Sequence, residues 1–141
     1  MNIAPPIQVS KTYQLPIQEV WELITSQTYL SQWLMPGNFR AEKDYSYTFN
    51  CEPNDDCSDG QVFGKVLEVN SPHSISFTWN SQGISKETKV TFQLEELSDG
   101  VCFSILHEGF PSADAKAIEA HTTGWNFHLS EIVKIQPIER N

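Results

Sequence analysis

Histidine is the residue type in this chain best suited to chemistry, and two of the four histidines stand in suggestive places. His107 lies near the end of an alternating strand pattern, and His121 lies in the long helical pattern that follows. Because both are a similar distance from the turn between these patterns, we expect their rings to face each other. Such a pair could transfer a proton, bind a metal ion or form buried hydrogen bonds, and the sequence favours the hydrogen bonds.

A metal site at this pair would lack a third ligand. His128 follows His121 by two helical turns, about 10 Å along the axis, since a helix rises about 1.5 Å per residue. One zinc ion needs its ligand nitrogens at about 2.1 Å and could not bridge that separation. No carboxylate or thiol stands one turn away on the same face. We therefore expect neither a metal ion nor a cofactor.

Acidic side chains gather in one turn-rich segment. They are Glu52, Asp55, Asp56 and Asp59. An EF-hand calcium loop beginning at Asp55 would need oxygen ligands at its third and twelfth positions, where this chain has Cys57 and Val66. The segment is expected to be a solvated loop, and it could contact a protein partner.

Nucleophilic catalysis finds no support in the motifs. The chain has no G-x-S-x-G elbow, and the segment Gly60–Gly64 lacks the Lys-Ser/Thr ending of a phosphate loop. Cys102 has the opposite strand parity to His107, so we expect it to face away from that ring, buried and inert. Cys51 and Cys57 are expected to be free thiols, since no secretion signal points to an oxidising compartment.

Aromatic residues, 11% of the chain, recur on the apolar faces of the predicted elements. They could wall a cavity that takes a small apolar or aromatic molecule, or they could simply fill the core. The residues expected to line the cavity are Trp33, Phe49, Phe77, Trp79, Phe92, Phe103, His107, His121, Trp125 and His128.

The elements that must position these residues follow from periodicity. Period-two patterns predict six strands: Ile7–Tyr13, Tyr45–Asn50, Gln61–Val69, Ser74–Trp79, Lys86–Leu94 and Val101–Glu108. Turn residues at hairpin spacing make the later strands an antiparallel meander. Period-3.6 patterns predict two short helices after the first strand, near 16–27 and over Tyr29–Leu34, and a long helix over Ser112–Ile135. Ser112 is the expected N-cap of the long helix, and Phe127 should point away from its apolar stripe.

Length and charge limit the classes of function. A chain of 141 residues predicts one domain, 1–141. Its net charge of −9 disfavours nucleic acid and anionic membranes as partners. No apolar run approaches the ~20 residues that span a bilayer, and the first residues lack the features of a signal peptide. The sequence therefore predicts a cytoplasmic protein.

Several segments, taken together and in order, carry a family resemblance. They are Leu15–Thr25, Leu30–Leu34 with its LxxW pattern, Gly64–Val69, Ile75–Trp79, Thr88–Leu94, His107–Phe110, and Gly124-Trp125 with Leu129. The chain resembles the START-like (SRPBCC, helix-grip) superfamily, and within it the small single-domain form of the family named after the activator of heat-shock-protein-90 ATPase. The segment 51–60 is longer and more acidic than that family's pattern.

This resemblance implies an α+β helix-grip fold, in which a curved antiparallel sheet wraps around a long C-terminal helix. It implies non-enzymatic binding of a small hydrophobic or aromatic molecule between sheet and helix. One alternative is a chaperone-type interaction or stress-response protein that acts through its outer surfaces. A second alternative is a cyclase- or hydrolase-like enzyme, which would have to use the pocket histidines.

Overall fold

Six antiparallel strands form a single sheet in a computed structural model that describes residues 3–50, 61–81, 84–132 and 135. The strands, in the order β1-β6-β5-β4-β3-β2, are β1 Ile7–Tyr13, β2 Ser46–Asn50, β3 Gln61–Asn70, β4 Ser74–Ser81, β5 Thr88–Leu97 and β6 Gly100–Glu108. Cys51, Cys57 and the acidic segment 52–59 lie outside the described residues, so what was expected of them stays a prediction.

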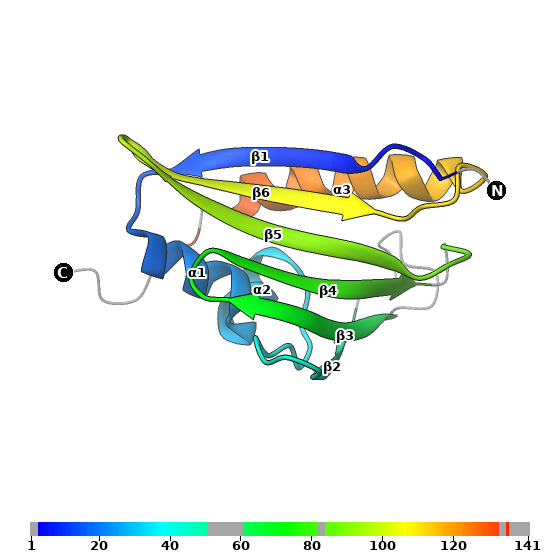
Figure 1. Ribbon diagram of the computed structural model, residues 1–141, viewed down its shortest axis with the longest axis horizontal. Helices are drawn as coiled ribbons and strands as arrows, with labels where there is room; N and C mark the ends of the chain where they lie inside the picture. Colours follow the sequence, from blue (N-terminus) through cyan, green and yellow to red (C-terminus); the bar gives the residue numbers. More distant parts are fainter. Residues whose placement is uncertain (1–2, 51–60, 82–83, 133–134, 136–141) are drawn as a thin grey trace.

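The predicted strand parity is confirmed along β6. Val101, Phe103, Ile105 and His107 are buried on the inner face, and the residues between them are half-buried on the outer face. Cys102 therefore faces away from His107, as expected, but it is half-buried rather than buried. The reason is that none of the helices in the described part of the chain packs on the outer face of the sheet at this position (Figure 1).

Three helices complete the fold: α1 Ile17–Thr25, α2 Gln27–Trp33 and α3 Ala115–Ile132. In Figure 1, α3 runs behind β1 and β6, roughly along the strands. The indole Nε1 of Trp33 donates to the carbonyl oxygen of Leu23 at 2.7 Å and so fixes α2 against α1. The fold is α+β and helix-grip, as the sequence predicted.

The start of α3 corrects one prediction. The helix begins at Ala115, so Ser112 is not its N-cap. The carbonyl oxygen of Asp114 accepts the first helical hydrogen bond from the amide of Ile118, at 3.0 Å. Residues 111–114 form a turn before the helix, which is closed by a hydrogen bond from the Asp114 amide to the Pro111 carbonyl at 2.9 Å. Asp114 therefore takes the position expected for Ser112.

Side chains tie one end of α3 to the connection between β4 and β5 and the other end to β1. Before its first turn, the carboxylate of Asp114 accepts hydrogen bonds from the Ser85 amide, at 2.9 Å, and from the Ser85 hydroxyl. In its last turns, the Leu129 carbonyl accepts from the Tyr13 hydroxyl of β1 at 3.1 Å. Burial holds the pKa of Tyr13 well above its usual range, so that hydroxyl remains a donor. These two contacts hold both ends of α3 in place.

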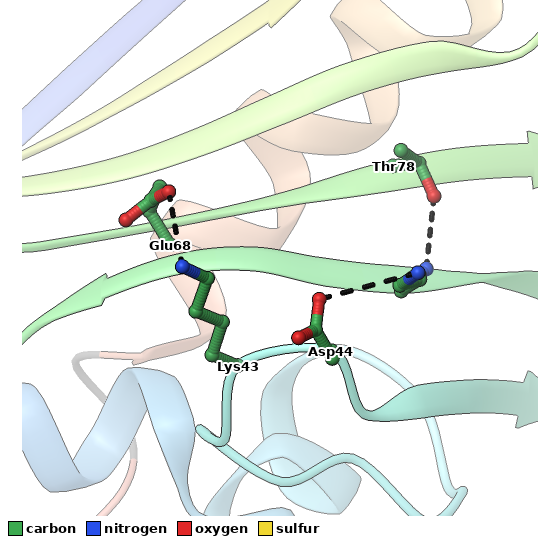
Figure 2. Close-up of polar contacts among 5 residues, drawn as sticks. Lys43, Asp44, Glu68 and Thr78 are labelled. Atoms are coloured by element: carbon green, nitrogen blue, oxygen red, sulfur yellow. Dashed lines mark hydrogen bonds and ion pairs between the residues drawn. The ribbon is translucent and has the colours of Figure 1, made fainter.

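The β3–β4 pairing contains a register shift and, next to it, a close approach that requires a glycine. The register shifts between Val66 and Glu68, and the Lys65 amide donates to the side-chain oxygen of Thr78 at 2.8 Å instead of to a main-chain carbonyl (Figure 2). The Thr78 carbonyl accepts instead from the hydroxyl of Tyr47. That carbonyl lies so close to Gly64 that a Cβ there would overlap it. Such bulges bend a strand and increase its twist.

Ion pairs join the segment before β2 to the outer side of β3. Figure 2 shows Lys43 beside Glu68, with a nitrogen–oxygen distance of 3.9 Å. Asp44 pairs with the side chain of Lys65 at 4.0 Å. All four side chains are more than half exposed, so each pair contributes only about 0–1 kcal/mol. The packed inner face, rather than these pairs, positions the site.

Gly64 and Gly124 should respond oppositely to substitution by alanine. Gly64→Ala should lower the free energy of unfolding by about 1–3 kcal/mol, because its Cβ would overlap the Thr78 carbonyl. Gly124→Ala, within α3 and with nothing but its chain neighbours and the helix backbone within 4 Å of the new Cβ, should raise it by up to about 1 kcal/mol. Urea denaturation of both variants measures the difference, and a change of the same sign in both would contradict this account.

Candidate functional site

All ten predicted site residues meet on the inner side of the sheet. β2, β4, β5 and β6 supply six of them, α2 supplies Trp33, and α3 supplies His121, Trp125 and His128. Eight are buried, while His121 and His128 are half-buried. The two half-buried residues lie on one flank of α3, so that flank is the part of the predicted site nearest to solvent.

The buried members pack against one another ring to ring. Phe92 meets Phe103 edge-on with centroids 5.1 Å apart, and Trp79 meets Trp125 at 5.2 Å. Trp33 contacts Phe103 at 6.1 Å and His128 at 6.5 Å. These are favourable aromatic geometries, each contributing about 0.5–1.5 kcal/mol beyond the area buried. Much of the space among the ten residues is therefore occupied by their own rings.

Sequence reasoning missed several members of this layer, among them Phe110, whose ring lies 4.4 Å from that of His107. Phe39 stacks on Phe49 with centroids 5.7 Å apart and also contacts Tyr47 and Phe77. It belongs to the irregular segment between α2 and β2, which has no period from which its direction could be read. Tyr47 shares the strand parity of Phe49, a signal that could have found it. Thr88 is buried and polar, and only its partners reveal its role.

His107 is fully buried, with both ring nitrogens engaged. Its Nδ1 accepts from the indole Nε1 of Trp125 at 3.0 Å. The Thr88 hydroxyl donates to the Trp79 carbonyl at 2.8 Å, so its oxygen is available to accept the proton on His107 Nε2, also at 2.8 Å. The neutral ring with its proton on Nε2 satisfies every one of these bonds.

Burial lowers the pKa of His107 to about 2, and the neighbouring His121 adds to this shift. The ring therefore stays neutral at physiological pH. General acid–base catalysis works best with a pKa near the operating pH and needs a nitrogen within reach of the substrate. His107 meets neither condition, which weakens the enzymatic alternative that relied on it.

His121 has the opposite tautomer. Its Nδ1 must carry the proton, because it bonds to the carbonyl oxygen of Ala117 at 2.8 Å and a carbonyl can only accept. Its Nε2 is therefore an acceptor, and the indole Nε1 of Trp79 donates to it at 3.2 Å. The centroids of the two imidazole rings lie 5.3 Å apart, with the ring planes nearly perpendicular, so the two histidines are neighbours, as expected. Each histidine thus accepts from one tryptophan, and both bonds join α3 to the sheet.

Among the described residues, no group of three histidine, cysteine, aspartate or glutamate side chains is arranged to hold a metal ion. Nor does any described helix have the length and apolar character needed to cross a membrane. The cytoplasmic location stays a prediction.

A groove of about 510 Å³ lies on the opposite, outer face of the sheet. Its lining includes Ile3 and Pro6 from the segment before β1, Leu67 from β3, and Lys89 and Glu108, which are paired across β5 and β6. None of the ten predicted residues is part of it. The groove is therefore distinct from the predicted space between the sheet and α3.

The comparisons with known proteins agree with this architecture. The family model for Activator of Hsp90 ATPase homolog 1-like protein matches residues 14–136. This chain belongs to that family. No curated protein matches it.

Solved structures of similar fold come from several bacteria. Protein MLL2253 from Mesorhizobium loti is 20% identical with a TM-score of 0.81, over 90% of this chain and 93% of that one. Protein BH1534 from Bacillus halodurans is 27% identical with a TM-score of 0.74, over 92% of this chain and 94% of that one. Protein CV1439 from Chromobacterium violaceum is 20% identical with a TM-score of 0.74, over 96% and 100%. The likenesses below 25% identity show the fold.

Thr88 should prove necessary for the His107 tautomer. Thr88→Val removes the oxygen that accepts from Nε2 and leaves a buried N–H without a partner, which should lower the free energy of unfolding by about 1–3 kcal/mol. Thr88→Ser keeps the hydroxyl, so its free energy of unfolding should fall by less. Urea denaturation compares the two variants, and nitrogen NMR of the native protein should find the proton of His107 on Nε2. Equal losses in both variants would contradict this role.

His107 should also make stability depend on pH. Its pKa is about 2 in the folded protein against 6.5 for an unperturbed ring, so below pH 6.5 only the unfolded chain gains this proton. The stabilising contribution is complete above about pH 6.5 and is lost as the pH falls, by about 1.4 kcal/mol per unit. His107→Gln can keep an acceptor and a donor but cannot titrate. Urea denaturation from pH 7 to pH 5 should show a steeper loss in the native protein, by roughly 2 kcal/mol in all. Equal slopes would contradict the assignment.

Proposed function

We propose that this protein binds a small hydrophobic or aromatic molecule between the sheet and α3, without catalysing a reaction. The observation that carries the proposal is the open flank of α3. Apart from its two chain neighbours and the backbone of α3 itself, nothing lies within 4 Å of a Cβ built at Gly124, although Trp125 beside it is buried. A helix that packs fully along this flank would leave no such space.

The flank has the composition of a binding site. On a helical wheel of 100° per residue, Gly124 falls on the same side of α3 as the half-buried His121 and His128. His121 contacts Trp79, and His128 contacts Trp33, so the flank lies next to buried aromatic rings. Small-molecule sites combine such apolar walls with a few polar groups. A ligand would enter beside Gly124 and displace α3 slightly from the rings beneath it.

The roles of the two neighbouring histidines differ under this proposal. His107 contributes only to the shape of the site, because both of its ring nitrogens are already hydrogen-bonded within the protein. His121 is closer to the flank and is the histidine that a ligand could reach. Polar recognition, expected from both residues, is therefore assigned to His121.

The chaperone-type alternative has one supporting observation. Phe127 is 57% exposed on the outer side of α3, as its place on the wheel predicted, and the family takes its name from an ATPase activator. Phe127 follows Gly124 by three residues, and its ring contacts that of His128 at 5.6 Å, so a partner surface at Phe127 would adjoin the Gly124 flank.

Binding of Nile red, a neutral aromatic fluorophore, should require the open flank. Gly124→Leu would place a branched side chain in the space, so we expect at least a tenfold loss of affinity by fluorescence titration. Thr123→Leu is the matched control, because Thr123 is exposed on the other side of the same helix, and its affinity should match that of the native protein.

Three results would contradict the proposal. One is failure of the native protein to bind Nile red or any other neutral aromatic probe. Another is an equal affinity of both leucine variants and the native protein for the dye. The last is a loss of affinity in Thr123→Leu as large as that in Gly124→Leu, because the dye would then be binding elsewhere on α3.

A further inference from the structure

Two indole–imidazole bonds join α3 to the sheet, and the one between Trp79 and His121 is the longer. Its nitrogen–nitrogen distance is 3.2 Å, against 3.0 Å between Trp125 and His107. A hydrogen bond weakens as it lengthens towards this limit. His121 is also half-buried, whereas His107 is fully buried. This bond is therefore the one that a molecule entering beside Gly124 would meet first and separate most easily.

The two partners present a fixed pair of complementary groups. The indole of Trp79 can only donate. The Nε2 of neutral His121 can only accept, because Nδ1 holds the proton for the Ala117 carbonyl. A group inserted between them keeps both interactions only if it accepts from the indole and donates to the imidazole.

A hydroxyl group meets this requirement, since it carries one proton and two acceptor lone pairs. A carboxylate has acceptors only and would set its lone pairs against the lone pair of Nε2. An ammonium group has donors only and would meet the N–H of Trp79. The net charge of −9 further disfavours an anionic ligand.

We propose that the Trp79–His121 pair recognises a hydroxyl group of the ligand, which inserts between the indole N–H and the imidazole Nε2. This inference rests on the proposed function and names the ligand class: a small apolar or aromatic molecule with a neutral hydroxyl. The apolar body lies beside Gly124 and His128, and the hydroxyl replaces one protein hydrogen bond by two. No proton is transferred, and His121 keeps its tautomer.

Three probes with the same apolar body test the inference: α-naphthol, its methyl ether and naphthalene. The ether can accept from Trp79 but cannot donate to His121, and naphthalene can do neither. By calorimetry, naphthol should bind about tenfold more tightly than the ether, which is what one hydrogen bond to a buried partner contributes. Naphthalene should bind no more tightly than the ether.

His121→Phe removes the acceptor and keeps a ring of similar size. In this variant the affinity ratio of naphthol to ether should fall to about one, while naphthalene still binds. His73→Phe is the matched control, because His73 is exposed in the turn before β4, and its ratio should remain about ten. A ratio of about ten in both variants would overturn the inference.

The indole N–H signals in a nitrogen–proton NMR spectrum locate the probe. Naphthol should shift the Trp79 signal and leave that of Trp125, which remains bonded to His107, nearly unchanged. Binding of all three probes with equal affinity, or a shift confined to Trp125, would overturn the hydroxyl site while leaving the proposed function intact. If none of the probes binds, and Nile red does not bind either, both proposals fail together.

Discussion

Two indole N–H groups are buried where α3 packs on the sheet, and the arrangement of the inner face depends on an acceptor for each of them. An indole nitrogen is a donor only, and a buried donor left unpaired costs about 1–3 kcal/mol. In this chain each indole is paired with a histidine, Trp125 with His107 and Trp79 with His121. The bonds require one imidazole to carry its proton on Nε2 and the other on Nδ1. A third residue, Thr88 or Ala117, enforces each choice.

The two histidines therefore have different roles: one serves packing and the other serves recognition. The ring of His107 is enclosed and neutral, and it holds Trp125 against β6. His121 makes the equivalent bond at the edge of the packed region, beside helix positions where space remains. The ring centroids of His107 and His121 lie only 5.3 Å apart. The two histidines nevertheless serve different purposes, because His107 is fully buried and His121 is not. The family defines the fold, and this local difference indicates where a ligand would be recognised.

Periodicity in the sequence was sufficient to predict the architecture. Period-two alternation located all six strands and the inward direction of His107, because a pleated strand alternates its side chains with no exceptions along a regular stretch. It could not locate Phe39, which belongs to an irregular segment, or the role of Thr88, which depends on a carbonyl and a ring from two other strands. The start of α3 was missed for a similar reason. The turn that delays it is closed by main-chain bonds, and sequence pattern does not record these.

The contacts at the two ends of α3 limit how the helix can move. Asp114 is bound to Ser85, in the connection between β4 and β5, and Leu129 is bound to Tyr13 on the edge strand β1. A helix hinged at one end could swing out as a lid, but a helix held at both ends behaves as a beam on two supports. Such a helix can make room for a ligand by rotating about its own axis or by bending at its centre. Both motions are greatest near Gly124, the residue with the least side chain to resist them.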